Sequence, residues 1–477
     1  MADTSYPEIW NGVACTTRFT YATGHVLNDI CASMWFTYLL IYFNLVLDFN
    51  PTQSGIVLLI GQIADALSTP FVGYQSDRND NFWMCRYGRR KTWHLIGTIC
   101  TLTTFPFIFG SCVGCEESDT WAQLIYYASF VIVFQFGWAA VQISHLSLIP
   151  ELTPNEHERT RLTALRYSFT VFSNILVYSI TWWSLGVDTT GDGRVSPADA
   201  PKFRRVVWIG LVVGTICSTI FHIGVREPDN ILAEYNDATR LNIQGQSPRR
   251  TIKNVFQDGN LYLVACVYMS TRLFVNLSQV LLPLYLHETL KLSAQLLAVI
   301  PLCVYLSSFA TSFVVHSLNK ESGRKMAFFA GVVWGVIACF WMRFRDGPNY
   351  LHYEIYGVAV LLGASGSMLL VTSLGLTADF IGTDTDRGAF VYGLMSFSDK
   401  LSNGIAVIII QHLHSTIFPE STYYRDALCY VCGGSAVFGL ISIIILRTTN
   451  LGRTHLYENL NEDPVPRPQI INETIDH

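Results

Sequence analysis

Long apolar segments alternate with short polar segments along almost the whole chain. Each apolar segment is long enough to cross the hydrocarbon core of a bilayer as a helix, which takes about 20 residues. The pattern therefore predicts an all-α membrane protein with twelve transmembrane helices, at roughly 17–46, 54–76, 92–112, 120–150, 160–186, 204–226, 258–288, 294–318, 325–343, 350–378, 388–413 and 426–447.

The composition agrees with this pattern. Of the 477 residues, 50% are hydrophobic and only 14% are charged, whereas soluble domains carry about 25% charged residues. The apolar segments hold no nucleophile–base pair and no metal-ligand cluster, so we expect neither an enzyme nor a cofactor. Nothing in the composition indicates a nucleic-acid partner; the expected surroundings are the lipid bilayer, and the expected state is a monomer. No cleaved signal peptide is expected, because residues 1–11 are polar and the first apolar segment is itself a span.

The charges of the loops predict the orientation. The connections after the second, fourth, sixth and eighth segments are basic, whereas 47–53 and 113–119 contain no Lys or Arg. The connection 187–203 is less clean, because it carries Arg194 and Lys202. Since clustered Lys and Arg stay on the cytosolic side, we expect both termini in the cytosol.

The chain also repeats itself at about half its length. The run from Pro150 to Asn174 resembles the run from Ala378 to Asn403, with Glu151 matching Asp379, and the GRRK at Gly88 returns as GRK at Gly323. Parallel repeats of this kind predict two pseudo-symmetric halves with a substrate site between them near mid-membrane. The expected parts are an N-terminal tail (1–16), a six-helix half (17–226), a linker (227–257), a second six-helix half (258–447) and a C-terminal tail (448–477).

One loop motif carries a family resemblance. Gly73-x-x-x-Asp77-Arg78, followed by Gly88-Arg89-Arg90-Lys91, resembles the loop motif of the major facilitator superfamily, with 79–87 as an insertion. Asp65, Pro70 and Trp93 narrow the resemblance to the glycoside–pentoside–hexuronide:cation symporters. The motif's residues are expected to latch and release helix ends during gating. The alternative is that its basic residues only fix the topology. The gating set is Gly73, Asp77, Arg78, Gly88, Arg89, Arg90 and Lys91.

Three further runs, 24–40, 134–152 and 388–404, are similar to a branch of this family that carries cysteine into lysosomes and melanosomes. The resemblance implies an alternating-access carrier in the membranes of these organelles, with a role in pigmentation. Two alternatives remain: a carrier of another small solute, such as a sugar or a lysolipid, or a non-transporting receptor or assembly factor on the same fold.

Five charged residues lie inside predicted spans: Asp29, Asp65, Arg166, Arg272 and Lys400. Charges at this depth are costly, so they mark candidate functional sites. A zwitterionic amino acid needs a cation for its carboxylate and an anion for its ammonium group, and these residues supply both. The alternative is that they form internal salt bridges. Arg272 could instead extend to the membrane surface, and Lys400 is not expected to pair with the adjacent Asp399, because neighbouring helical residues point apart.

Sodium coupling is disfavoured, because Thr69 and Gln142 stand where the family carries two further acids. Neutral polar residues complete the candidate substrate site, with hydrogen bonding between helices as the alternative role. His25, one turn before Asp29, is also a candidate carrier of a coupling proton. The neutral set is His25, Asn28, Gln142, His145, Asn276, Tyr392 and Asn403.

The loops and the C-terminal tail add weaker signals. Cys112 and Cys115 are close enough for a local disulfide, and 188–199 matches the spacing of a calcium loop but ends in Asp199 and contains Pro197, which favours a simple polar turn. Tyr457-Glu-Asn-Leu460 resembles a tyrosine-based sorting signal for endolysosomes and predicts a sorting adaptor as partner. We expect no N-glycan, because the two sequons lie in a span and in a cytosolic tail.

Overall fold

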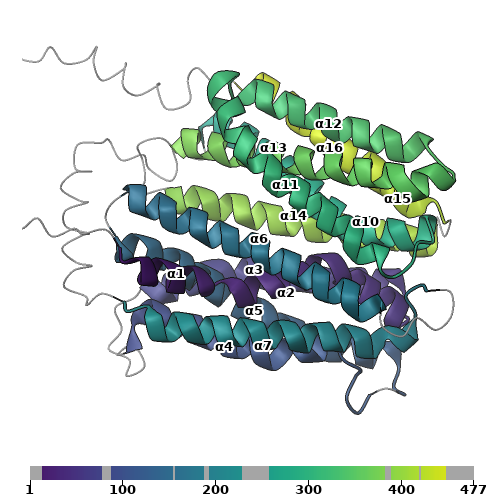
Figure 1. Cartoon of the computed structure of the whole chain (residues 1–477), viewed down its shortest axis with the longest axis horizontal. Helices are drawn as coiled ribbons and strands as arrows, with labels where there is room; N and C mark the ends of the chain where they lie inside the picture. Colours follow the sequence, from purple (N-terminus) through teal and green to yellow (C-terminus); the bar gives the residue numbers. More distant parts are fainter. Residues whose placement is uncertain are drawn as a thin grey trace, which may run out of the picture.

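The computed structural model describes residues 13–77, 87–115, 117–153, 156–186, 193–227, 257–381, 388–417 and 421–446. Within these ranges the chain forms helices and no strand. The long helices lie side by side as rods, with those of the first half on one side and those of the second half on the other (Figure 1). The first half consists of α1 (Cys15–Thr23), α2 (Val26–Ile41), η1 (Tyr42–Val46), α3 (Pro51–Asp77), α4 (Arg89–Ile108), α5 (Thr120–Leu152), α6 (Glu156–Gly186), η3 (Pro197–Asp199) and α7 (Ala200–Gly224).

The second half repeats this order of long helices. It consists of α10 (Gly259–Leu284), η4 (Tyr285–Thr289), α11 (Leu296–Glu321), α12 (Arg324–Phe344), η5 (Tyr350–Glu354), α13 (Ile355–Ile381), α14 (Gly388–Thr416), α15 (Tyr423–Ala427), η7 (Leu428–Cys432) and α16 (Gly433–Ile445).

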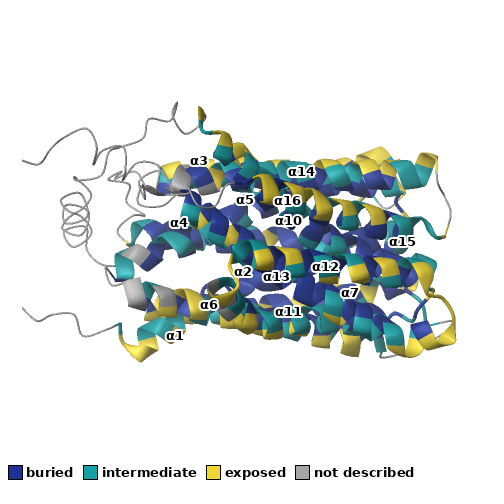
Figure 2. Cartoon of the chain, turned by 90° about the horizontal axis from the view of Figure 1, so that it is seen from above, coloured by how far each residue is buried: buried dark blue, intermediate teal, exposed yellow. Residues whose placement is uncertain are grey.

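Ten helical stretches among the described residues are long and apolar enough to cross a membrane. They correspond to ten of the twelve segments expected from the sequence. The other two expected spans are the long helices α4 and α6, which begin with the polar runs RRK and EHERTR and are therefore less apolar. Large apolar side chains such as those of Leu67, Ile125 and Phe313 are exposed in the protein and suit contact with lipid. Exposed residues recur along the length of the helices (Figure 2).

The internal repeat extends to the backbone. The first long rod ends in the π-helical segment η1, and Asp48 follows it with a φ of 57°. The corresponding rod of the second half ends in the π-helical segment η4, and Lys291 follows it with a φ of 53°. Because both turns use the left-handed region that non-glycine residues seldom adopt, the match is specific. The two halves are thus related structurally as well as in sequence.

Helix packing joins the halves along a few seams. In the first half α5 packs against α3 and α4, and in the second half α13 packs against α11 and α12. Across the halves, α3 packs against α14 and α6 against α11. The buried apolar side chains form one large core that runs through both halves, together with a smaller cluster around Tyr21, Leu148 and Phe221.

The first long rod is interrupted between α1 and α2, at Gly24 and His25. Gly24 is needed here because a Cβ atom would lie 2.5 Å from the ring of Phe221 and 2.8 Å from that of His145. At the interruption, the backbone carbonyl groups of Tyr21 and Gly24 accept hydrogen bonds from histidine side chains, and the Tyr21 carbonyl also accepts from the Gly24 N–H. A break in the helix thereby fixes the orientation of the polar groups around it.

Candidate functional site

The first cluster of intramembrane charges lies within the N-terminal half, between α2 and α6. His25 Nδ1 lies 2.9 Å from Asp29 Oδ1, and Arg166 Nη2 donates to His25 Nε2 at 3.0 Å. Thr170, one turn after Arg166, donates to Asp29 Oδ2 at 2.9 Å. His25 therefore separates the acid from the arginine, although all three had been expected in one site.

Neither charge of this cluster is neutralised by an opposite permanent charge. Among the described residues, no carboxylate lies within 4.0 Å of Arg166, and no Lys or Arg side chain lies within that distance of Asp29. Arg166 Nε is also buried without a hydrogen-bond partner. A half-buried cation and a buried anion in this state are receptive to a ligand with complementary charges.

The second cluster joins the two halves. Lys400 on α14 places Nζ 2.7 Å from Asp65 Oδ1 on α3, and also donates to Thr69 Oγ1 at 2.8 Å. Thr69 in turn donates to Asp65 at 3.2 Å. The Lys400 ammonium group is thus the cation beside Asp65, at the position where the family resemblance had suggested a damaged cation site.

The third cluster lies within the C-terminal half and is neutralised. Arg272 Nε donates to Asp399 Oδ2 at 2.8 Å, and Asn276 and Asn403 donate to Asp399 Oδ1 at 3.3 and 2.6 Å. Arg272 lies near the middle of α10, so the interpretation that it extends to the membrane surface is wrong. Asp399 pairs with Arg272 and Lys400 with Asp65, as expected from the opposite directions of adjacent side chains.

Sequence reasoning missed Asp399 as a site residue. It is an acid inside an apolar span, the same signal that identified Asp29 and Asp65, and it is 2% exposed. Of the adjacent pair Asp399 and Lys400, only Lys400 had been considered a candidate. Two neutral candidates form hydrogen bonds with Trp138 of α5: Asn28, which is fully buried, donates to its carbonyl, and Gln142 accepts from its indole.

A network of neutral polar side chains, separate from the three charge clusters, also connects the halves. Gln279 on α10 donates to Tyr305 OH at 2.9 Å and to Thr37 Oγ1 at 3.4 Å. Tyr178 on α6 lies 2.8 Å from the same Thr37 hydroxyl. His145 is buried and contacts the carbonyl of Tyr21 rather than the charged groups. The side chain of Tyr392 lies outside the described residues.

The GRRK and GRK repeats occupy equivalent places at one end of the bundle, which we call the basic face. In the first half, Arg90 Nε donates to Glu151 at 3.0 Å, and Lys91 Nζ donates to the Val225 carbonyl at the end of α7 at 2.7 Å. In the second half, Arg324 donates to Asp379 at 2.7 Å and Lys325 Nζ donates to the Leu446 carbonyl at 2.6 Å. The expected match of Glu151 with Asp379 is thus visible in their contacts.

The N-terminal half has an additional contact at this face. Glu227 accepts hydrogen bonds from the backbone N–H groups of Arg90 and Lys91, at 3.0 and 3.1 Å, and so caps α4. Burial raises the pKa of the Glu227 carboxyl, while the two N–H donors lower it. Gly88, which has a φ of 120°, gives the carboxylate access to these groups. Arg89 also contacts Glu151, at 3.3 Å.

Part of the expected gating motif cannot be placed. The side chain of Asp77 and all of Arg78 lie outside the described residues, as do Tyr457 and Leu460 of the tail. Gly73 lies in α3 with open space where a Cβ atom would be. The contacts of Arg89, Arg90 and Lys91 described above join helices of one half to one another.

Contacts at the other end of the bundle, the opposite face, join the two halves. Thr52 Oγ1 on α3 lies 2.6 Å from Ser415 Oγ on α14. The Ala294 N–H donates to the Gly193 carbonyl at 2.7 Å, and Arg194 donates to the His287 carbonyl at 3.0 Å. Arg194 was the basic residue that did not fit the charge pattern of the loops. It has a structural role in this set of contacts, Thr52–Ser415, Gly193–Ala294 and Arg194–His287, which we call the seal between the halves.

Two loop features resolve into local structure. Cys112 and Cys115 form a disulfide. Asp199 accepts from the Ser196 N–H and pairs with Lys202 at 3.0 Å, so its carboxylate serves the turn before α7. The remaining part of the suggested calcium loop, 188–192, lies outside the described residues.

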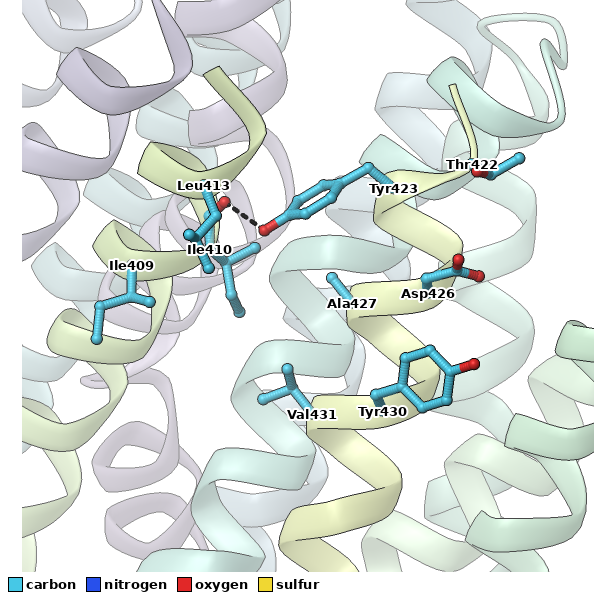
Figure 3. A pocket seen from close by; sticks show the side chains of 9 residues that line it. All are labelled: Ile409, Ile410, Leu413, Thr422, Tyr423, Asp426, Ala427, Tyr430 and Val431. Carbon is cyan, nitrogen blue, oxygen red and sulfur yellow. Dashed lines mark hydrogen bonds between the residues drawn. The ribbon is translucent and has the colours of Figure 1, made fainter. Parts of the chain in front are cut away.

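A pocket of about 390 Å³ lies between α14 and the α15–η7 segment, where Tyr423 donates to the Ile410 carbonyl (Figure 3). Apolar side chains make up most of its lining, and Asp426 is its one charged lining residue. None of the expected substrate-site residues line it, so it is separate from the three charge clusters.

Comparison with known proteins agrees with this architecture. A family profile described as MFS/sugar transport protein matches residues 20–417. The chain is 44% identical over 463 residues to major facilitator superfamily domain-containing protein 12 of Homo sapiens, covering 92% of this chain and 95% of that one, and 43% identical to its Mus musculus counterpart, covering 91% and 94%. A crystal structure of a D-xylose-proton symporter shares the fold with a TM-score of 0.68 at 14% identity, covering 93% of this chain and 99% of that one.

Proposed function

This chain belongs to the major facilitator superfamily, in the family of the proteins named major facilitator superfamily domain-containing protein 12, and on that premise we propose that it carries cysteine from the cytosol into lysosomes and melanosomes. It is a multi-pass membrane transporter, not an enzyme. The proposal concerns its substrate, its location and its direction of transport.

The observation that carries the substrate proposal is the state of Asp29 and Arg166. A cationic side chain without a carboxylate partner and an anionic side chain without a Lys or Arg partner lie on either side of His25. An α-amino acid brings one carboxylate and one ammonium group, which would complete both pairs. A neutral sugar would complete neither.

The other intramembrane charges support this assignment by contrast. Arg272 is neutralised by Asp399 and Lys400 by Asp65, so their role is to hold helices together. The Lys400 ammonium group beside Asp65 also supports a mechanism without sodium at this position, because it supplies the positive charge there. The substrate contacts therefore centre on Asp29 and Arg166.

The places where the halves are joined support alternating access. The contacts at Thr52–Ser415 and Gly193–Ala294 close the opposite face, and Asp65–Lys400 joins the halves at mid-membrane. We assign the basic face to the cytosol, because its loops are rich in Lys and Arg, and the opposite face to the organelle lumen. Substrate would then enter from the basic face and leave after the seal opens.

The choice of cysteine among amino acids, and of lysosomes and melanosomes among membranes, rests on the resemblance of the runs 24–40, 134–152 and 388–404 to carriers of cysteine. The tail sequence Tyr457-Glu-Asn-Leu460 supports an endolysosomal address read by a sorting adaptor.

The test is uptake of labelled cysteine by proteoliposomes that contain the purified chain. Uptake above that of empty vesicles, with competition by unlabelled cysteine and none by xylose or a lysolipid, is the expected result. Uptake of labelled xylose or of a labelled lysolipid, together with no cysteine accumulation, would replace the proposal by one of those solutes. Location is tested separately, by imaging the Tyr457→Ala variant, which is expected to shift from lysosomes to the cell surface.

A further inference from the structure

Four histidines from different helices of the N-terminal half lie one after another in space, from the basic face to Asp29. They are His222 on α7, His94 on α4, His145 on α5 and His25 at the start of α2, and we call them the histidine chain. His222 Nε2 lies 3.1 Å from His94 Nδ1. The ring centroids of His94 and His145 are 6.0 Å apart, and those of His145 and His25 are 5.5 Å apart.

The hydrogen bonds fix the direction of the first part of the histidine chain. His94 Nε2 lies 3.0 Å from the Gly24 carbonyl, so this nitrogen carries a proton and Nδ1 accepts one from His222 Nε2. The Tyr87 hydroxyl lies 2.9 Å from His222 Nδ1, to which it can donate, and 3.2 Å from the His222 carbonyl. Tyr87 is 44% exposed at the basic face, so the histidine chain begins at the surface.

In the middle of the histidine chain, His145 has a ring nitrogen that forms no hydrogen bond. His145 is fully buried, and its Nε2 donates to the Tyr21 carbonyl at 2.8 Å. Its Nδ1 is buried without a hydrogen-bond partner. Such a group is costly in a purely structural role, and an apolar side chain would avoid the cost. A free imidazole nitrogen is, however, what a proton carrier needs.

The inner end meets the proposed substrate site. His25 Nδ1 lies 2.9 Å from Asp29 Oδ1, whereas its Nε2 accepts from Arg166. While Arg166 holds this bond, His25 has no free nitrogen to accept a proton from His145. If Arg166 turns to a substrate carboxylate, His25 Nε2 becomes an acceptor and can pass its Nδ1 proton to Asp29.

The charged and titratable groups around the histidine chain are consistent with passage of a proton. Lys91 faces His222 and Tyr87, Arg166 faces His25, and the Tyr21 ring stacks on His145 at 4.2 Å. Lys91 and Arg166 are both positive, so a proton is not held on the rings between them, and Glu227 lies at the outer end, on the backbone N–H groups of Arg90 and Lys91. The negative charge at the inner end is Asp29, which would accept the proton and, once neutral, release the ammonium group of the substrate.

We propose that the histidine chain conducts the coupling proton between the basic face and Asp29, and that Arg166 makes this conduction depend on bound substrate. The inference rests on the proposed function and adds its coupling ion. Each transfer binds one proton at one ring nitrogen and releases one from the other, so one proton enters at Tyr87 and one arrives at Asp29. Transfer across the two wider gaps, His94 to His145 and His145 to His25, requires rotation of a ring or one intervening water.

The test compares net transport with exchange in proteoliposomes containing a pH-sensitive dye. In the unaltered chain, labelled cysteine and protons should move together, and protons should not move without cysteine. His94→Gln keeps a donor for the Gly24 carbonyl but cannot be protonated. It should slow proton-coupled net transport about 100-fold, the scale on which a positioned proton-transfer group acts. Cysteine exchange at equal pH, which needs no net proton transfer, should stay within about twofold.

His222→Gln should behave like His94→Gln, and His352→Gln is the matched control, because His352 is exposed in η5 of the other half. Thermal unfolding of each variant shows that it folds. Net transport of His94→Gln at the unaltered rate, or cysteine transport in the unaltered chain without proton movement, would overturn the histidine chain as a proton pathway while leaving the carrier intact. Absence of cysteine exchange in the unaltered chain would instead overturn the proposed function and the pathway's role with it.

Discussion

Arg166 and Arg272 are intramembrane arginines in opposite surroundings. Arg166 bonds to the neutral side chain of His25, whereas Arg272 pairs with the carboxylate of Asp399. The same residue type is therefore receptive to a ligand in one half and structural in the other. Burial of a charge costs free energy that must be offset by a partner, and the two halves meet this requirement differently.

Arg166→Gln is expected to raise the half-saturating concentration of cysteine about 100-fold, with little effect on stability. Loss of a buried charge-assisted contact costs about 3 kcal/mol, or roughly 100-fold in affinity. The measurement is the concentration dependence of uptake, with Arg166→Lys as a companion that keeps the charge and recovers part of the affinity. Unchanged half-saturation in Arg166→Gln would remove this residue from the substrate site.

Arg272→Gln should instead lower the stability of the protein and have little direct effect on cysteine affinity. Without the guanidinium, the buried Asp399 carboxylate keeps only neutral donors, and we expect unfolding to become easier by about 2 kcal/mol. This figure is below that of a fully buried pair, because the Arg272 side chain is 31% exposed. Thermal unfolding in detergent measures the effect, and Asp399→Asn in the same chain should restore stability. A double variant no more stable than Arg272→Gln would contradict the pairing.

At the scale of elements, α4 and α12 begin at equivalent places on the basic face, each after a glycine. The two sites differ because only the glycine before α4 has a carboxylate beside it. Gly88 precedes α4 and Gly323 precedes α12, and both have a positive φ, 120° and 81°. Glu227 contacts the first site, where a Cβ atom would lie 2.5 Å from its Oε2, but at Gly323 a Cβ atom would meet nothing within 4 Å.

Gly88→Ala should therefore destabilise the protein more than Gly323→Ala. Both substitutions strain the backbone by about 1 kcal/mol, and only the first also displaces the carboxylate that caps α4. The expected loss is about 2 kcal/mol for Gly88→Ala, measured as unfolding free energy. Equal losses in the two variants would show that Glu227 contributes nothing to the cap.

The seam between α3 and α14 makes another prediction at this scale. Asp65→Asn and Lys400→Gln each leave one buried charge unpaired, which typically costs about 3 kcal/mol. The double variant leaves none, so its loss of stability should be smaller than the sum of the two single losses. A double-mutant cycle on thermal unfolding measures this coupling. Additive losses would mean that the 2.7 Å contact between the two side chains has no energetic weight.

At the scale of the whole molecule, the halves must separate at the opposite face for transport to be completed. Thr52 and Ser415 place their hydroxyl oxygens 2.6 Å apart across the seam. Cysteines at these positions are close enough for a disulfide. Thr52→Cys with Ser415→Cys should therefore trap the closed opposite face.

Uptake by this double variant should fall under oxidising conditions and recover after addition of a reductant. The single variants Thr52→Cys and Ser415→Cys are the controls for other cysteines of the chain, and both should keep their uptake under oxidation. Cross-linking without loss of uptake would contradict a mechanism in which these helix ends separate.

Much of the site was identifiable from sequence, because charges in apolar spans are conspicuous at any position. Asp29, Asp65, Arg166, Arg272 and Lys400 all belong to polar clusters in the structure. Their pairing was not identifiable, since partners such as Asp65 and Lys400 are separated by most of the chain. His94 and His222 went unnoticed for the same reason: each looks like an isolated polar residue until α4 and α7 are placed side by side.

The sequence by itself determined the all-helical membrane fold, the repeat of its two halves and the depth of its charges. These properties follow from local hydropathy, because whether a segment crosses the bilayer depends mainly on its own length, apolar content and flanking charges. The tertiary structure alone decided which charges neutralise one another, which of the two intramembrane arginines is left without a carboxylate, and that four histidines from separate helices are neighbours of one another in turn. Such contacts depend on helix packing across long sequence separations, and no local pattern specifies them.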